Sequence, residues 1–208
     1  MRTWGRRNRL ALLALPVGAL MAWGATSYRI LTIWNPWQLT DEVAAGPGEQ
    51  AHLVHHAEDA QGHYVTDLRV SAGPARQVTA LADTEGSAVF FPGRPGSVLW
   101  QVDLTVSADP STVVSGCQLR LVDTRGRETA YSTVAPGAEV PFDPCVPAAT
   151  PGPMPDLGFG LSDLDEPRPQ TYTVPVVFRT ADDFVPGRLD LWYSPPRYAS
   201  LALAVEDA

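Results

Sequence analysis

The most reactive side chains in the sequence are its four histidines, which lie within 12 residues of one another: His52, His55, His56 and His63. In a β-strand His52 and His56 would share one face, because side chains alternate, and His55 would point to the other. His63 opens the next apolar run and would approach them across a hairpin. Imidazole nitrogens bind zinc and copper, so His52, His56 and His63 are candidate metal ligands. Two alternatives stay open: solvated histidines on an edge hairpin, and an acid sensor that gains charge at about pH 6–6.5.

The two cysteines, Cys117 and Cys145, are the other candidate reactive groups. Neither belongs to a C-x-x-C motif or adjoins a histidine, which argues against a redox or nucleophilic role. Two cysteines can pair in only one way. The bond would close a loop of about 28 residues and would stabilise the fold by roughly 3–4 kcal/mol in the chain-entropy account. We therefore predict a structural disulfide.

Recognisable catalytic motifs are missing from the sequence. It contains no G-x-S-x-G elbow, no H-E-x-x-H, no S-x-x-K and no GxxxxGK[ST] loop. All 15 basic residues are arginine, so no lysine can form a Schiff base or grip a phosphate. Paired carboxylates for glycoside hydrolysis stay open, because any two acids can meet in a fold. We predict a non-enzymatic protein without a cofactor, with an unfamiliar cell-wall hydrolase or transferase as the less favoured alternative.

Aromatic side chains outside the regular apolar pattern are candidates for partner binding. Exposed aromatics beside arginine are typical of interface hot spots. We assign four residues to this role: Phe159, Trp192, Arg197 and Tyr198. The alternative reading of Trp192 is a side chain covered by the proline-rich loop at 144–169.

These residues lie on or between segments with the periodicity of β-strands. The clearest is Ser97 to Ser107, where five apolar residues alternate with polar ones, and we expect Trp100 and Val102 at the centre of the core. Shorter runs bounded by Gly, Pro or Asp recur at 51–57, 63–70, 114–122, 171–179, 188–193 and 200–205. About ten short strands predict an all-β, immunoglobulin-like antiparallel sandwich over residues 51–208.

Proline sets the limits of this regular pattern. Eight prolines fall within residues 141–170, so we expect a long loop at 144–169 rather than a central strand or a helix. Loops of that length in compact domains are often functional. Pro175 lies in the middle of the next strand and predicts that this strand is at a sheet edge.

Residues 10–33 form the longest apolar stretch of the chain. Leu10 to Tyr28 contains 19 residues without a charged side chain. As a helix this run would cover roughly 28 Å, close to the ~30 Å hydrocarbon core of a bilayer. We predict a retained transmembrane signal-anchor helix over 10–33, with a cleaved signal peptide as the alternative. A basic segment, 1–9, precedes it and a linker, 34–50, follows it.

The charges on either side of this stretch predict its orientation. Basic residues favour the cytoplasmic side and tryptophan favours the interface, so five residues are assigned to the membrane interface: Arg6, Arg7, Arg9, Trp34 and Trp37. The predicted location is a single-pass protein of the cell membrane with a cytoplasmic N-terminus and an extracytoplasmic C-terminal domain. Residues 34–208 carry ten arginines and all 23 acidic residues, a formal charge of −13, which disfavours binding to nucleic acid.

One resemblance rests on the runs VLWQVDLTV, GCQLRLVDTRGRE, DPCVP and RLDLWYSPP. Over residues 97–205 this layout resembles small immunoglobulin-like domains on single-pass envelope proteins of high-GC Gram-positive bacteria. The resemblance implies an exported accessory domain and transfers no active-site residue.

From these observations we predict a non-enzymatic, membrane-anchored extracytoplasmic β-sandwich that serves as an interaction module for another envelope protein. The partner would bind at an exposed strand edge or at the 144–169 loop. The alternative is an exported domain that binds a metal or a ligand through the His52–His63 hairpin.

Overall fold

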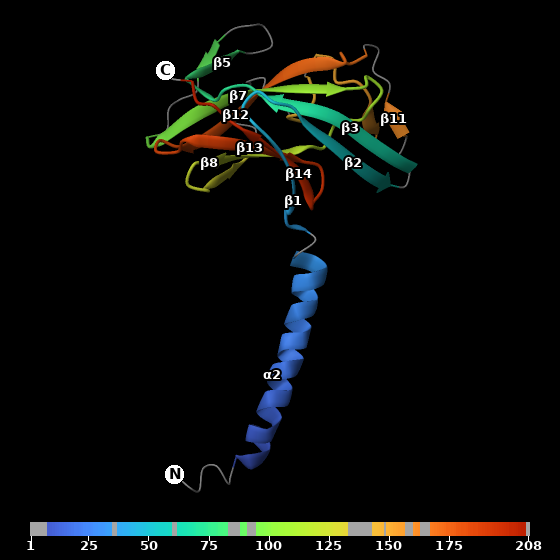
Figure 1. Ribbon diagram of the computed structural model, residues 1–208, viewed down its shortest axis with the longest axis vertical. Coiled ribbons are helices and arrows are strands. Elements are labelled where there is room, and N and C mark those ends of the chain that lie inside the picture. The colour runs from blue at the N-terminus through green and yellow to red at the C-terminus, as the bar shows by residue number, and fades with distance from the viewer. Residues whose placement is uncertain are drawn as a thin grey trace. The chain divides into compact units, whose positions relative to one another are not determined.

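The computed structural model describes residues 8–34, 37–59, 62–82, 88–90, 95–132, 143–147, 149–156, 160–162 and 167–206. The chain divides into two compact units, Met1–Leu39 and Thr40–Ala208. The first contains the helix α2 (Arg9–Arg29) and one short π-helical segment, η1 (Ile30–Trp34). The described part of the second is built from β-strands and turns (Figure 1).

The prediction of a transmembrane helix over 10–33 is not supported by the structure. Within the described residues, no helix is both long enough and apolar enough to cross a membrane. The apolar run of α2 is diluted by Gly18, Gly24 and the hydroxyl residues Thr26 and Ser27. The prediction rested on the length of the run and on its lack of charged residues, and these four residues lower its apolarity. The predicted single-pass location in the cell membrane is therefore wrong.

The assignment of five residues to a membrane interface depended on that span. Arg6 and Arg7 lie outside the described residues, and Arg9 is the first residue of α2. Trp34 ends η1, and both Trp34 and Trp37 are exposed. Without a spanning helix, no observation places these side chains at a lipid surface.

One sheet of the second unit, called here the β7 sheet, has the order β12-β7-β3-β2, with β4 pairing to β7 as well. Its strands are β2 (Ala51–Asp59), β3 (Gly62–Ala72), β4 (Arg76–Val78), β7 (Ser97–Ala108) and β12 (Thr171–Ala181). All its pairings are antiparallel, and β2 and β3 form the predicted hairpin. Among the described strands β12 pairs with β7 alone, so the strand that contains Pro175 is at the sheet edge, as predicted.

The other sheet, called here the β13 sheet, has the order β1-β14-β13-β8-β9. Its strands are β1 (Asp41–Ala45), β8 (Gln118–Asp123), β9 (Glu128–Ala130), β13 (Pro186–Trp192) and β14 (Arg197–Ala202). β1 runs parallel to β14 and lies within the expected linker, 34–50, where we predicted no strand. The chain has two further ribbons, β5 (Ala80–Ala82) with β6 (Ala88–Phe90) and β10 (Met154–Asp156) with β11 (Gly160–Ser162). The second ribbon lies inside the proline-rich 144–169 segment.

The core lies between the two sheets, which are stacked in layers (Figure 1). The buried side chains of β7 include Trp100, Val102, Leu104 and Val106, which alternate with partly exposed residues, as the period-two pattern predicts. They pack in one cluster with buried leucines of the β13 sheet, among them Leu121, Leu189 and Leu191. Each such side chain contributes about 1.5–3 kcal/mol relative to exposure. The predicted β-sandwich is confirmed.

Candidate functional site

The structure does not bring the three candidate metal-binding histidines together. In the β2–β3 hairpin, His52, His56 and His63 pair with Arg69, Val65 and Glu58 respectively. His52 and His56 are four residues apart on one extended strand, which separates their backbones by about 13 Å. Each histidine therefore has its own surroundings, and a shared metal ion has no support in this geometry.

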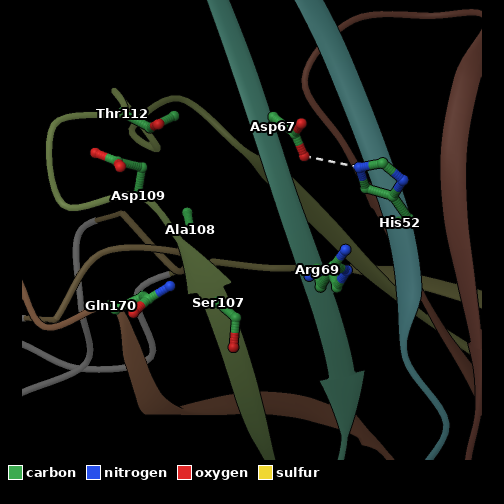
Figure 2. Close-up of a pocket in the computed structure, with 8 residues that line it drawn as sticks. All are labelled: His52, Asp67, Arg69, Ser107, Ala108, Asp109, Thr112 and Gln170. Carbon is green, nitrogen blue, oxygen red and sulfur yellow. Dashed lines mark hydrogen bonds and ion pairs between the residues drawn. The ribbon is translucent and has the colours of Figure 1, made fainter.

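His52 instead belongs to a polar pocket on the outer face of the β7 sheet (Figure 2). Its Nε2 lies 2.7 Å from Oδ1 of Asp67, and both side chains are more than half exposed. The pocket has a volume of about 280 Å³ and is also lined by Arg69, Asp109 and Gln170. The register explains the grouping, because Arg69 of β3 lies between His52 of β2 and Ser107 of β7.

Inside this pocket the carboxylate acceptor groups have hydrogen-bond partners, whereas two donor groups have none among the described residues. Both carboxylates have partners, since Asp67 contacts His52 and Asp109 accepts hydrogen bonds from the backbone and hydroxyl of Ser111. Those Ser111 hydrogen bonds hold the pKa of Asp109 below its usual value. The Arg69 guanidinium and the Gln170 side-chain amide make no hydrogen bond or ion pair with another residue that the structure describes. The pocket therefore offers unused donors beside two carboxylates.

Arg168 fixes the loop that forms one side of the pocket. Its side chain is 1 % exposed, and its guanidinium donates to the backbone oxygens of Thr112, at 2.9 Å, and Asp109, at 2.7 Å. The same group lies 5.6 Å from the ring centre of Tyr172. Gly152 packs against it with a φ of +72°, and a Cβ there would stand 2.9 Å from the Arg168 Cβ. Arg168 thus holds the backbone of Asp109 and Thr112 in place, although it does not itself line the pocket.

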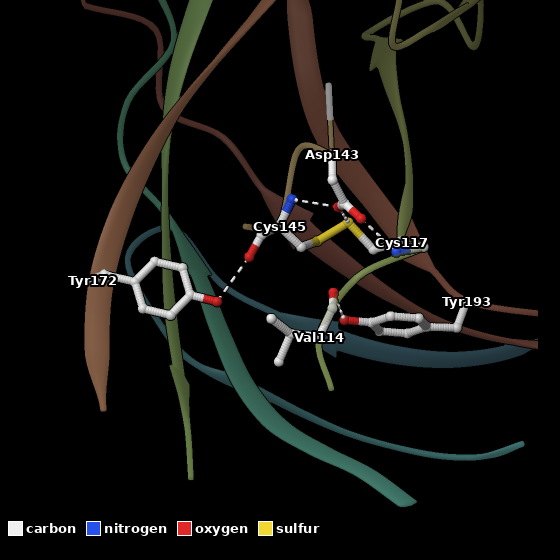
Figure 3. The surroundings of a disulfide bond; sticks show 7 residues. Val114, Cys117, Asp143, Cys145, Tyr172 and Tyr193 are labelled. Atoms are coloured by element: carbon white, nitrogen blue, oxygen red, sulfur yellow. Dashed lines mark hydrogen bonds between the residues drawn. A yellow bond between two sulfur atoms is a disulfide. The ribbon is translucent and has the colours of Figure 1, made fainter. Parts of the chain in front are cut away.

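The second chemical cluster surrounds the disulfide (Figure 3). The predicted bond between Cys117 and Cys145 is present, with Cα atoms 6.1 Å apart. Asp143 lies beside it: its Oδ1 is 3.7 Å from the Cys117 Sγ, and its carboxylate accepts the backbone N–H groups of Gly116 and Cys145. Burial raises the pKa of Asp143 despite these two hydrogen bonds. Sequence reasoning found the cysteines and missed the acid.

Two tyrosines tie the disulfide segment to the sheets. The Tyr172 hydroxyl donates to the Cys145 oxygen at 2.7 Å, and the Tyr193 hydroxyl donates to the Val114 oxygen at 2.8 Å (Figure 3). Burial raises the pKa of Tyr172 to about 12. On its other side the Tyr193 ring stacks on His55, with centroids 5.5 Å apart. Burial lowers the pKa of His55, and the charge of His56 lowers it further.

The candidate partner-binding residues lie at different places on the β13 sheet. Trp192 is half-buried and lies 5.7 Å from the Arg120 guanidinium, which also pairs with Asp190 at 2.8 Å and with Glu128. Trp192 also borders a groove of about 190 Å³ that includes Cys117, Tyr131 and Pro144. Tyr198 is buried, and Arg197 pairs with Asp41 at 3.2 Å. Phe159 lies outside the described residues.

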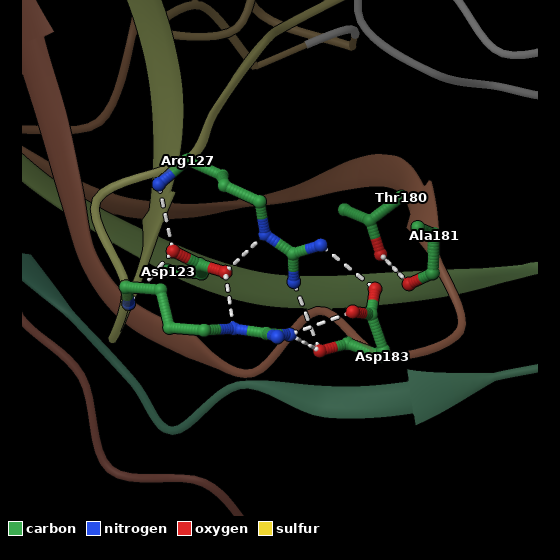
Figure 4. A network of polar contacts seen from close by, with 6 residues as sticks. Asp123, Arg127, Thr180, Ala181 and Asp183 are labelled. Atoms are coloured by element: carbon green, nitrogen blue, oxygen red, sulfur yellow. Dashed lines mark hydrogen bonds and ion pairs between the residues drawn. The ribbon is translucent and has the colours of Figure 1, made fainter.

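A polar network joins two turns at one end of the sandwich (Figure 4). Arg127 and Arg125 each contact both Asp123, at the end of β8, and Asp183, in the turn between β12 and β13. Burial opposes ionisation of Asp123, but hydrogen bonds from Arg127 and Arg125 outweigh it and lower its pKa. Hydrogen bonds from the same two arginines lower the pKa of Asp183. The four charged side chains pair with one another, so we interpret this network as a contact that holds the two turns together rather than as a binding site.

Sequence reasoning could have found part of the pocket. Pairing the two histidine-rich runs as a hairpin places Asp67 and Arg69 next to His52, and that signal was available. Asp109 and Gln170 follow and precede strands whose register the sequence does not specify. Their approach to His52 depends on three strand pairings, so only the structure reveals it.

Comparison with known proteins gives little further information. No protein-family model matches the chain, and no curated protein matches it. One similar solved structure is an uncharacterised β-sandwich protein from Clostridium difficile 630, which is 9% identical. The match covers 79% of this chain and 95% of that chain, with a TM-score of 0.34.

Proposed function

We propose that this chain is a non-enzymatic binding module on an immunoglobulin-like β-sandwich, and that its pocket takes a small polyhydroxylated ligand. The observation that carries this proposal is that the exposed side chains of Arg69 and Gln170, which have no partner among the described residues, lie beside the carboxylates of Asp67 and Asp109. A hydroxyl group both donates and accepts hydrogen bonds, so a polyol satisfies both kinds of group at once.

The size and charge of the pocket narrow the class of ligand. A volume of about 280 Å³ lies just below the usual range for ligand pockets of about 300–1,000 Å³, which favours a ligand no larger than one sugar ring. Residues 34–208 are strongly acidic, and two carboxylates line the pocket against one guanidinium. A neutral or cationic polyol therefore suits the site better than an anionic one.

The expected affinity is weak. Four hydrogen bonds with a net contribution of about 1 kcal/mol each total at most about 4 kcal/mol, and the entropy lost on association opposes them, so the Kd is about 1 mM or weaker. The walls of the pocket are open and polar, so burial of apolar surface adds little to the binding free energy. Binding in this range is accessible to nuclear magnetic resonance titration.

The test is a titration of the ¹⁵N-labelled chain with a neutral hexose, an amino sugar and a uronic acid. We expect saturable shifts at Arg69, Asp109 and Gln170, with the uronic acid weakest. Arg69→Gln should weaken binding about fivefold or more, whereas Arg179→Gln, on β12 of the same sheet but outside the pocket, should not. No saturable shift from any of the three sugars at about 10 mM, tenfold above a Kd of about 1 mM, would refute the proposal.

A second candidate function is recognition of a protein segment at the Trp192 groove. The specific observation is that Asp190 and Glu128 hold the Arg120 guanidinium near the Trp192 ring, beside Tyr131 and Pro144. Grooves lined with aromatic rings bind extended proline-rich peptides. A proline-rich decapeptide should shift the Trp192 indole signal, and Trp192→Ala should remove the binding while Trp34→Ala does not. If both variants bind equally, the groove is not the site.

A further inference from the structure

Three potential metal-binding atoms converge at the disulfide. The sulfur atoms of Cys117 and Cys145 and a carboxylate oxygen of Asp143 all lie within 4.8 Å of one another. For zinc with Zn–S of about 2.3 Å and Zn–O of about 2.0–2.2 Å, the sulfur-to-oxygen edge of a tetrahedron is about 3.5–3.7 Å. The observed distance from Asp143 Oδ1 to Cys117 Sγ is 3.7 Å. The carboxylate therefore already stands where a zinc ligand would stand relative to that sulfur.

The surroundings of Asp143 support a ligand role. The backbone N–H groups of Gly116 and Cys145 hold its carboxylate in place, as outer hydrogen bonds orient metal ligands in established sites. In the part of the chain that the structure describes, no arginine or histidine pairs with this partly buried acid. A carboxylate in such a place gains from a nearby cation. Asp143 is thus oriented and lacks a counter-charge.

One residue of the cluster borders a groove. The groove of about 190 Å³ that borders Trp192 has Cys117 and Pro144 among its lining residues. It therefore reaches one proposed ligand, Cys117, and the residue between the other two. A three-ligand site needs such an opening, because water or another ligand completes the tetrahedron.

We propose that reduction of the disulfide converts Cys117, Asp143 and Cys145 into a site for one zinc ion. In the oxidised protein the sulfurs are bonded to each other and offer no thiolate. A phosphine reductant delivers two electrons, water supplies the oxygen of the phosphine oxide, and the two sulfurs take up two protons. Zn²⁺ then displaces both protons and binds the two thiolates and the Asp143 carboxylate, with the sulfurs separated to roughly 3.8 Å. This site shares no residue with the polyol pocket.

The experiment compares the oxidised and the phosphine-reduced full chain under anaerobic titration with Co²⁺, followed by Zn²⁺. We expect the reduced protein to bind one Co²⁺ with a thiolate-to-cobalt absorption band that Zn²⁺ removes. The oxidised protein should show no such band. Zn²⁺ should also raise the thermal midpoint of the reduced protein and leave that of the oxidised protein unchanged, because a ligand stabilises only the state that binds it.

A variant distinguishes the assigned ligand set from two thiols that bind metal without the carboxylate. Asp143→Asn should weaken Zn²⁺ binding by the reduced chain about tenfold or more, whereas Asp182→Asn, an exposed acid in the β12–β13 turn, should not change it. Near-ultraviolet circular dichroism reports whether the reduced, zinc-loaded chain is folded. The proposal is overturned if the reduced chain binds Co²⁺ no better than the oxidised chain, if Asp143→Asn binds as wild type, or if the loaded chain is unfolded.

Discussion

Removal of the disulfide should destabilise the β-sandwich by an amount that the loop length sets. The two cysteines are 28 residues apart in the sequence. In the chain-entropy account the loss of loop closure raises the entropy of the unfolded chain by about 12 cal/mol/K, or about 3.6 kcal/mol at 25 °C. For a chain of this size that loss lowers the thermal midpoint by roughly 7–14 °C. The variant Cys117→Ala/Cys145→Ala removes the bond and leaves small, uncharged side chains.

The assay is urea unfolding of the full chain, followed by the near-ultraviolet circular dichroism of the aromatic residues in the core. We expect the midpoint to fall and the slope with denaturant to rise, because the unfolded chain without the cross-link is less compact and exposes more surface. The reduced wild-type chain, without metal, is the matched control and should unfold near the double variant. A loss below about 1 kcal/mol would refute the loop-closure reasoning.

Three further perturbations test individual contacts. His55→Phe should keep the stack on Tyr193 and reduce the loss of stability that wild type shows below about pH 6.5. Folding lowers the pKa of His55, so the folded protein binds this proton less readily than the unfolded chain and loses stability as the pH falls. Thermal melts at a series of pH values measure this. Asp190→Ala should cost about 2–3 kcal/mol in urea unfolding, because its fully buried carboxylate holds two arginine side chains. Gly152→Ala should cost about 1–2 kcal/mol, since φ is +72° and the new Cβ meets Arg168.

Each of these outcomes has a control that separates it from a general loss of stability. For His55, wild type and His55→Phe must differ at pH 5 and agree at pH 8; an unchanged slope would mean that other groups set the pH dependence. For Asp190, the control is Asp182→Ala at an exposed position, which should change the free energy of unfolding little. For Gly152, Gly126→Ala has a similar φ of +83° but open space around the added Cβ, so its smaller cost isolates the clash with Arg168.

The sequence predicted those elements whose signal is local. The alternation of Ser97 to Ser107 identified β7 and its buried face, and Pro175 identified an edge strand, because each follows from one strand alone. The disulfide followed from having only two cysteines. β1 was missed, since its parallel pairing with β14 joins residues far apart in sequence and short strands lack a clear period.

The errors have a different physical origin. The run from Leu10 to Tyr28 was judged by its length and by its lack of charge, whereas within the described residues no helix is long and apolar enough to cross a membrane. The histidines were grouped by sequence distance, although an extended strand separates residues four positions apart by about 13 Å. In the first case the length of the segment was taken as evidence that it spans a membrane. In the second case closeness in sequence was taken as evidence of closeness in space.

The two candidate sites are joined by a short series of contacts. The Tyr172 hydroxyl bonds to Cys145, its ring lies beside the Arg168 guanidinium, and Arg168 holds the backbone of Asp109 at the pocket wall. If this series transmits a change, reduction of the disulfide alters polyol binding, and Tyr172→Phe removes the effect. Gly152→Ala displaces Arg168 directly, so it should weaken polyol binding in both redox states. If reduction of the disulfide leaves polyol binding unchanged, the closely packed interior isolates the two sites from each other and the series of contacts transmits nothing.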